Sequence, residues 1–421
     1  MNFLKNMSIY TLTAMLNSAV PFLLLPVFTA YLTPSDYGVL ATFTTMIAFL
    51  SPLIIFGITS LIGIDFFKLT QDDLARHFGS MIGIPIIATI LIFLFLALFG
   101  KYIATYFDVP LDWLIYLPFY TLLTMLPQTL SIIYRSQQKP LYFASLEISQ
   151  TLMHVGLSIW LVVAIRLSWQ GRMYSMAISG IVFSSIAIFL IYKMGYFKLN
   201  FSYEIIKNTL KFGTGLIPHS VGNLTIRMSD RLFIVAIIGL FDAGQYAVGV
   251  QVASIMFILV STFNQAWGPF LFQNLSSITE DKKRMLVKYS YYVMGAFFII
   301  GVLLNLVSPI IYHFFINEQF HDSIKFILWM SVGYFFTAVY LTFVDYIFYE
   351  KKTHILSLIT LFNVLLNLTL NYLFVHKFGA IGATYAYAIS MFFVMCLAWI
   401  LSNKIYPMPW FYWLNKENNA N

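Results

Sequence analysis

The stretch His219-Ser-Val-Gly-Asn223-Leu-Thr-Ile-Arg227-Met-Ser-Asp230-Arg231 places three charged side chains in a segment that is otherwise apolar enough to cross a membrane. His219, Asn223, Arg227 and Arg231 recur every four residues, and Asp230 lies three after Arg227, so on a helix they form one polar stripe. A charge at the centre of a bilayer costs about 2.5–3.5 kcal/mol even on lenient scales. The stretch therefore predicts a membrane helix whose polar face meets protein or a water-filled cavity.

The composition of the whole chain agrees with a membrane protein. Of the 421 residues, 60% are hydrophobic and only 10% are charged, against about 25% charged in soluble domains. The mean hydropathy is +0.81. Cys396 is the only cysteine, which excludes a disulfide within the chain and argues against a cysteine metal site.

Apolar segments long enough to span a bilayer recur along the chain. We expect twelve transmembrane helices, at about 7–31, 36–63, 79–99, 112–134, 141–165, 172–192, 211–241, 243–270, 287–312, 324–349, 354–376 and 379–402. The fold class is thus an all-α polytopic membrane protein. The polar gaps are all short; the longest, 193–210 and 271–287, leave no room for a soluble catalytic domain, and the second is expected to hold a surface helix at Glu280–Arg284.

The basic residues set the expected orientation. With the N-terminus cytoplasmic, 17 of the 24 Lys and Arg residues fall inside and five fall outside, and the remaining two are Arg227 and Arg231. The outside five are Lys101, Arg166, Arg172, Lys325 and Lys377. This bias predicts that both termini are cytoplasmic. It also explains the formal charge of +7 better than nucleic-acid binding does, so no nucleic-acid partner is expected.

The chain repeats itself. Three pairs of segments match at offsets of 211, 208–209 and 213 residues: Gly171–Ser179 with Gly382–Ser390, Leu32–Val39 with Leu240–Val248, and Lys139 with Lys352. Each repeat holds six helices, so the halves run in the same direction. We expect an N-terminal lobe (1–198) and a C-terminal lobe with a cytoplasmic tail (199–421), with the substrate path between them.

Both halves carry a polar stripe at the same repeat position. Glu147, Gln150 and His154 share one helical face with Thr151 and Ser158. At the offset of 213, Gln150, His154 and Ser158 correspond to three residues of the eleventh helix, namely Asn363, Asn367 and Asn371. Such residues either join helices by hydrogen bonds, at about 0.6 kcal/mol each, or line a shared polar cavity. The coincidence favours the cavity; His154 is interpreted as a hydrogen-bond partner more than a proton relay.

The charged cluster also has two interpretations. Arg227, Asp230 and Arg231 neutralise one another and fix helix packing, or they bind an anion. The three charges sum to +1, so one cation is left over, and the planar fork of arginine suits phosphate. We therefore predict an anion site at Arg227 and Arg231, with Asn223 beside it and Asp230 either orienting or neutralising the arginines.

Enzyme signatures are missing from the sequence. There is no Gly-x-x-x-x-Gly-Lys phosphate loop, no His-Glu-x-x-His and no Gly-x-Ser-x-Gly. We predict a transporter without a metal or organic cofactor. Coupling to H⁺ or Na⁺, or no coupling at all, is left open.

Three stretches resemble the polysaccharide flippases of the MOP (multidrug/oligosaccharidyl-lipid/polysaccharide) exporter superfamily, the Wzx-type O-antigen and capsule transporters. They are Pro26–Gly38, Ser229–Ile234 with Gly239 and Gly244–Tyr246, and Gly379–Thr384. The resemblance implies two six-helix, MATE-like lobes around a central cavity. It also implies an undecaprenyl-pyrophosphate-linked oligosaccharide moved across the bacterial inner membrane, and cavity cations that matter, here Arg227 and Arg231.

In the flippase interpretation the polar stripes and His154 contact sugar hydroxyls, and the polysaccharide polymerase and chain-length machinery are further partners. Lipid II flippases have two more helices and several arginines in the first helix, which argues against a peptidoglycan role. One alternative is a cation-coupled multidrug antiporter on the same fold, for which Glu147 is the candidate carboxylate. A less favoured one is a membrane polymerase or glycosyltransferase, which would need a large outer loop with catalytic acids.

Overall fold

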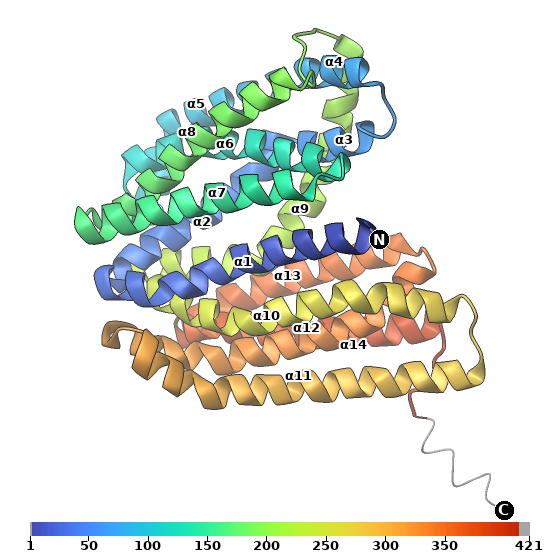
Figure 1. The fold of residues 1–421 in the computed structure, drawn as a ribbon. Helices are drawn as coiled ribbons and strands as arrows, with labels where there is room; N and C mark the ends of the chain where they lie inside the picture. The colour runs from blue at the N-terminus through green and yellow to red at the C-terminus, as the bar shows by residue number, and fades with distance from the viewer. Residues whose placement is uncertain (1, 412–421) are drawn as a thin grey trace, which may run out of the picture. The chain divides into compact units, whose positions relative to one another are not determined.

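The computed structural model describes residues 2–411, in which every regular element is a helix. The side chains of residues 2–8 and 353, and the predicted cytoplasmic tail from residue 412 with Lys416, lie outside the description. The helices (Figure 1) are α1 (Asn2–Tyr31), α2 (Pro34–Ile55), α3 (Ile58–Asp65), α4 (Gln71–Met81), α5 (Gly83–Tyr106), α6 (Leu111–Ser136), α7 (Pro140–Ile159), η1 (Trp160–Ala164), α8 (Ser168–Lys193), α9 (Tyr203–Ile237), α10 (Leu240–Leu275), α11 (Glu280–Phe315), η2 (Glu318–Ile324), α12 (Lys325–Tyr349), α13 (Thr353–Phe378) and α14 (Ile381–Ile405).

The predicted all-α membrane fold is confirmed. Ten helical segments of the described part are long and apolar enough to cross a bilayer. The other two predicted spans, 112–134 and 211–241, correspond to α6 and α9. These are unbroken helices of 26 and 35 residues, and that they span the bilayer stays a prediction.

The contacts divide the chain into two compact units. Unit 1 comprises Met1–Leu224 and Ile238–Gly244, and unit 2 comprises Thr225–Ile237 and Gln245–Asn421. The division falls inside α9 and near the start of α10, so both helices contribute residues to both units. The predicted lobes 1–198 and 199–421 were drawn from internal symmetry and stay a prediction.

In unit 1, α6 is the central helix. It packs against α2, α3, α5, α7 and α8, and α1 packs against α7. Apolar side chains of α3, α4 and α6, among them Ile62, Phe78 and Ile133, form one buried cluster near one end of these helices. In unit 2, α12 is central and packs against α11, α13 and α14, and these helices lie side by side in Figure 1.

The predicted second span is broken in the structure. We expected one helix over 36–63, but α2 ends at Ile55 and α3 begins at Ile58. Phe56 and Gly57 both adopt left-handed backbone, with φ of 55° and 73°, which ends one helix and starts the next at this point. The Phe56 ring packs where Gly213 has no side chain, because a Cβ there would lie 2.1 Å from Phe56 Cδ1.

The predicted surface helix at Glu280–Arg284 is wrong as a separate element. α10 continues to Leu275 and α11 begins at Glu280, so these residues are the first turns of a 36-residue helix. Thr279 caps it by accepting a hydrogen bond from Lys282 N at 3.3 Å, and two acidic residues lie in its first turn, where the helix dipole favours them. The charges mark a helix end outside the apolar span, not a second helix.

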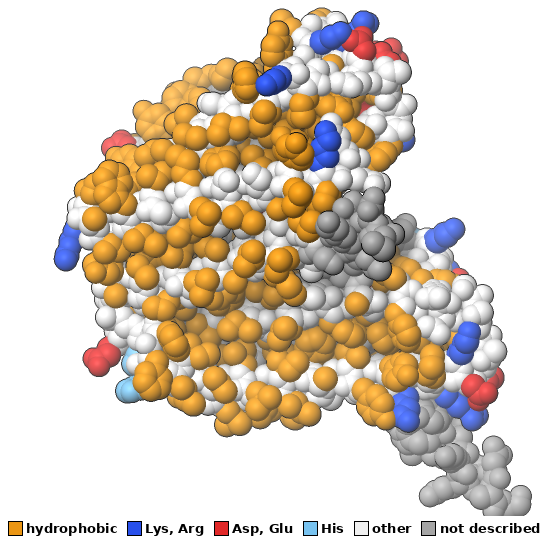
Figure 2. All heavy atoms as spheres, in the orientation of Figure 1, with side chains coloured by type: hydrophobic (Ala, Val, Ile, Leu, Met, Phe, Trp, Pro, Cys, Tyr) orange, Lys and Arg blue, Asp and Glu red, His pale blue; other side chains and the backbone are white. Residues whose placement is uncertain are grey.

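Figure 2 shows hydrophobic side chains over most of the visible face, with Lys, Arg, Asp and Glu gathered toward the ends of the helices. On α5, Leu91, Phe95 and Leu98 are 61%, 52% and 74% exposed, at helical spacing on one face. Apolar surface of this extent fits contact with lipid and not with water.

Candidate functional site

Asp230, the acid of the predicted cluster, is buried in unit 2 and satisfied by neutral donors. Its side chain is 8% exposed. The Tyr246 hydroxyl of α10 donates a hydrogen bond to Asp230 Oδ2, and Arg231 N donates to Asp230 Oδ1 at 2.8 Å. Tyr246 is fully buried, with its ring edge-on to Phe326 at 5.3 Å. The carboxylate is therefore held by a tyrosine that the sequence did not connect with it.

Arg231 makes no ion pair with this acid among the described residues, although its charge acts on the Asp230 carboxylate. Arg227 is exposed and Arg231 is half-buried. The Nε of Arg231 is buried and has no hydrogen-bond partner among the described residues. Because this unbonded N–H belongs to a positively charged guanidinium, it suits an anionic acceptor.

The asparagine stripe lies inside unit 2, on α13. Asn363, Asn367 and Asn371 are 6%, 1% and 0% exposed. Asn367 Nδ2 donates to Ser390 Oγ of α14 at 3.3 Å, and Ser229 Oγ of α9 donates to Asn367 Oδ1 at 3.5 Å.

Of the other two asparagines, one contacts a side chain of its own helix and one contacts α14. Asn371 Nδ2 donates to Asn367 Oδ1 at 3.0 Å, and Asn363 Nδ2 lies 3.7 Å from Met391 Sδ. These bonds join α9, α13 and α14. They explain only part of the stripe, because Oδ1 of Asn363 and Oδ1 of Asn371 are buried without a hydrogen-bond partner among the described residues. The predicted contact of the stripe with sugar hydroxyls stays a prediction.

The equivalent stripe on α7 of unit 1 forms two hydrogen-bonded groups, of which Glu147 anchors the first. Ser131 Oγ of α6 donates to Glu147 Oε1 at 2.5 Å, and Asn17 Nδ2 of α1 donates to Glu147 Oε2 at 3.5 Å. Thr151 Oγ1 donates to Asn17 Oδ1 at 3.0 Å. Gln150 lies on the same helix and is half-buried. Glu147 thus ties three helices together.

His154 belongs to the second group. Its Nδ1 lies 3.1 Å from Ser175 Oγ of α8, and the same oxygen lies 2.5 Å from Ser158 Oγ. Arg172, one turn earlier on α8, has its guanidinium carbon 4.5 Å from the centre of the Phe28 ring. The Nε of Arg172 is buried without a hydrogen-bond partner among the described residues. The predicted role of His154 as a hydrogen-bond partner agrees with this geometry.

The stripe on α9 divides between the two units. His219 Nε2 and Asn223 Nδ2 lie 3.1 Å apart in unit 1. Arg227, Asp230 and Arg231 belong to unit 2.

Sequence reasoning missed Tyr246 and Arg172 as members of these groups. A signal existed for Arg172, which lies at the start of a span in which buried cations are rare. Tyr246 was quoted only as a family motif residue, since a tyrosine among apolar residues carries no sign of its partner.

The comparisons with known proteins agree with the fold and give the family. The chain belongs to the family described as polysaccharide biosynthesis protein, whose model matches residues 27–325. The predicted place of the chain in a polysaccharide-related family is thereby confirmed. An uncharacterized membrane protein of Haemophilus influenzae is 23% identical over 378 residues, covering 87% of this chain and 89% of that protein. The Lsg locus putative protein 1 of the same organism is 24% identical over 151 residues, 35% and 37% of the two chains.

Two kinds of solved structure share the fold. An inward-facing multidrug resistance MATE family transporter of the MOP superfamily superposes with a TM-score of 0.74 at 13% identity, covering 92% of this chain and 94% of that chain. The lipid II flippase MurJ, in an inward closed conformation, superposes with a TM-score of 0.74 at 14% identity, covering 94% and 87%. The chain therefore has a polytopic transporter fold.

Proposed function

We propose that this protein moves an undecaprenyl-pyrophosphate-linked oligosaccharide from the cytoplasmic to the outer leaflet of the bacterial inner membrane. Support comes from the polysaccharide biosynthesis family and from the fold shared with a solved lipid II flippase. The observation that carries the proposal is the environment of Arg231. Its Nε is buried and has no hydrogen-bond partner in the part of the chain that the structure describes, while the neighbouring Asp230 accepts a hydrogen bond from Tyr246.

Arg227 and Arg231 would hold the pyrophosphate. A membrane-embedded cation costs several kcal/mol unless it meets an anion, and guanidinium donates paired hydrogen bonds to phosphate oxygens. In this role the guanidinium groups would keep their donors for the ligand, because Tyr246 and the Arg231 backbone N–H hydrogen-bond to the Asp230 carboxylate. The prenyl chain would stay in lipid.

The remaining features of the proposal follow from the sequence. The excess of basic residues on one side favours cytoplasmic termini, and the missing enzyme signatures favour a transporter over an enzyme. The polysaccharide polymerase and the chain-length machinery would act on the product. Coupling to H⁺ or Na⁺ is compatible with this scheme and is not required by it.

The test is surface glycan export in a flippase-null strain. We expect Arg227→Ala combined with Arg231→Ala to reduce export by roughly tenfold or more, because hydrogen bonds to charged groups contribute about 1.5–3 kcal/mol each. Lysine at both positions should restore part of the export, since it keeps the charge and loses the fork. The matched control is Arg76→Ala with Arg284→Ala, two exposed arginines of α4 and α11. Unchanged export in the first pair would refute the anion site.

A cation-coupled multidrug antiporter is the second candidate, favoured by the position of Glu147. Its carboxylate accepts hydrogen bonds from α1 and α6. A change in its protonation would therefore alter the hydrogen bonds that join three helices. Efflux of a cationic dye from cells separates the candidates. Dye efflux that is lost in Glu147→Gln, together with normal glycan export without this protein, would favour the antiporter.

A further inference from the structure

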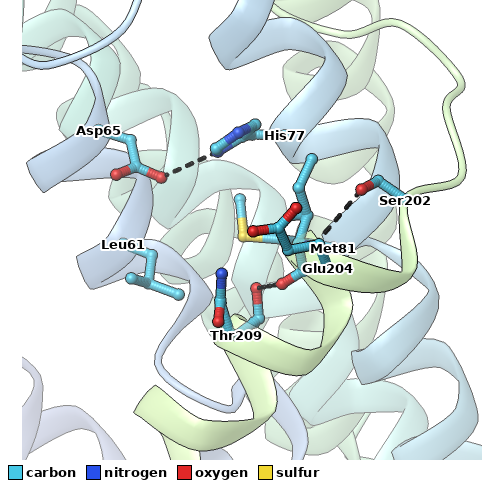
Figure 3. A pocket seen from close by; sticks show the side chains of 9 residues that line it. Leu61, Asp65, His77, Met81, Ser202, Glu204 and Thr209 are labelled. Carbon is cyan, nitrogen blue, oxygen red and sulfur yellow. Dashed lines mark hydrogen bonds and ion pairs between the residues drawn. The ribbon is translucent and has the colours of Figure 1, made fainter.

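Unit 1 contains a pocket of about 510 Å³ that none of the groups described above uses. It is lined by residues of α3, α4, α9 and the segment before α9: Leu61, Asp65, His77, Met81, Ser202, Glu204, Ile205, Asn208 and Thr209. Figure 3 shows the side chains of Asp65, His77 and Glu204 around this space. Its volume falls within the range of about 300–1,000 Å³ of small-molecule sites.

The wall formed by the segment before α9 is held against α4. Gly79 approaches Lys198 so closely that a Cβ would lie 1.8 Å from Lys198 O. Lys198 N donates to Ala75 O at 3.1 Å, and Ser80 Oγ donates to Asn200 O at 3.2 Å. These contacts fix the start of α9, and with it Ser202 and Glu204. The pocket is therefore formed before any ligand binds.

Some polar side chains of the pocket are hydrogen-bonded or paired within the chain, and others are not. His77 Nδ1 lies 3.3 Å from Asp65 Oδ2, and Thr209 Oγ1 donates to Ile205 O at 2.8 Å. The side chains of Glu204 and Asn208, by contrast, have no hydrogen bond recorded among the described residues and are exposed. They are a carboxylate and an amide, which together offer acceptors and donors to a ligand.

This chemistry selects among ligand classes. Two carboxylates repel phosphate, so the pocket differs from the anion site of α9. The described residues contain no group of three His, Cys, Asp or Glu placed to hold a metal ion. Free acceptors, a free amide and the apolar side chains of Leu61, Met81 and Ile205 suit a ligand with many hydroxyl groups and apolar C–H faces.

We propose that the pocket of Asp65, His77, Glu204 and Asn208 binds a neutral sugar unit of the transported oligosaccharide. The ligand class rests on the proposed flippase function. The pocket lies at the end of unit 1 near Arg76, Lys198 and Lys207, which the charge bias assigns to the cytoplasm. There it would meet the glycan before translocation and contribute to the choice of sugar.

The test is saccharide binding to the purified full-length protein in lipid nanodiscs, measured by calorimetry. The probe is the water-soluble oligosaccharide released by mild acid from the lipid-linked intermediates of the producing strain. We expect Glu204→Gln with Asn208→Ala to weaken binding by about tenfold, since two hydrogen-bonding groups are altered. The matched control, Glu350→Gln with Asn274→Ala, changes the same residue types in unit 2, at an exposed and a half-buried position, and should bind as the wild type does. Thermal unfolding of all variants checks their folding.

Two results would overturn the pocket proposal: no saccharide binding by the wild type, or equal binding by the pocket pair and the wild type. Binding that persists in Arg227→Ala with Arg231→Ala, and that inorganic pyrophosphate does not displace, would support it. Failure of the flippase proposal is a different result, namely unchanged export in the arginine pair.

Discussion

At the scale of single residues, the partner of a buried charge decides what its neighbours can do. Asp230 lies beside two arginines in sequence, which left open whether it orients or neutralises them. In the structure the Tyr246 hydroxyl donates a hydrogen bond to its carboxylate. The sequence predicted that these charges need partners, because burial in lipid is costly. It could not predict the tyrosine, which reaches the acid only after the chain turns from α9 into α10.

Removing the Tyr246 hydroxyl tests how far the buried Asp230 carboxylate depends on this hydrogen bond. We expect Tyr246→Phe to lower the free energy of unfolding by about 1–3 kcal/mol, because the buried Asp230 carboxylate loses a donor. In an Asp230→Ala background the same substitution should cost much less. Tyr102→Phe, at a side chain that is 76% exposed, is the control. Unfolding in a denaturing detergent series measures all of these variants. Equal costs of Tyr246→Phe in both backgrounds would show that the two residues are not coupled.

At the scale of elements, the family motifs turn out to build helix starts and close packing. Thr33 and Asp36 form a capping box at the start of α2, in which Asp36 Oδ2 accepts from Thr33 N at 2.9 Å. A Cβ on Gly38 would lie 2.0 Å from Leu240 O, and one on Gly244 would lie 1.7 Å from Pro34 O. Two motifs that are far apart in sequence thus pack against each other where α2 contacts α10 in unit 1.

This contact predicts that alanine is tolerated less well at the contact glycines than at glycines with open space around them. Gly38→Ala and Gly244→Ala should each destabilise the protein by about 1–3 kcal/mol, since backbone must move to admit the methyl group. Gly156→Ala and Gly295→Ala, at helical glycines with nothing within 4 Å of the added Cβ, should be neutral or stabilising. The fraction of monodisperse protein after heating, followed by size-exclusion chromatography, checks this. If all four variants behave alike, the contact has no such role.

Element boundaries were the part of the fold that the sequence predicted least well. Apolar length predicted the ten spans that the described helices confirm by length and composition, because lipid imposes that length directly; the other two, at α6 and α9, stay predictions. It missed the break at Phe56 and Gly57, where the reason is a ring packing against Gly213. It also split α11 at its charged first turns, because hydropathy marks the membrane boundary and not the end of a helix.

At the scale of the whole molecule, the internal repeat has a local structural signature. Gln138 and Lys351 both adopt left-handed backbone, with φ of 56° and 57°. Each precedes a lysine whose N–H donates back into the helix before it, Lys139 to Tyr134 O and Lys352 to Ile347 O. These positions are related by the offset of 213 residues that the sequence predicted. The repeat was predictable because the same turn recurs in both halves.

The functional groups follow the repeat only in part. The stripes of α7 and α13 each bond to a serine of the following helix, Ser175 and Ser390. The clustered arginines of α9 have no charged counterpart on α1, which carries no charge between Lys5 and its end. This asymmetry was visible in the sequence. The contact of Arg172 with Phe28 was not, because hydropathy placed this arginine only at the edge of a span.

The central claim is that the chain carries a lipid-linked oligosaccharide across a bilayer, and reconstituted vesicles test it most directly. Purified protein and a fluorescent undecaprenyl-pyrophosphate-linked oligosaccharide would be placed in vesicles, and a membrane-impermeant glycosidase would report which leaflet holds the glycan. We expect the wild type to expose inner-leaflet glycan to the enzyme, and the pair Arg227→Ala with Arg231→Ala to do so at least about tenfold more slowly. Glycan exposure no faster than in protein-free vesicles would contradict the account.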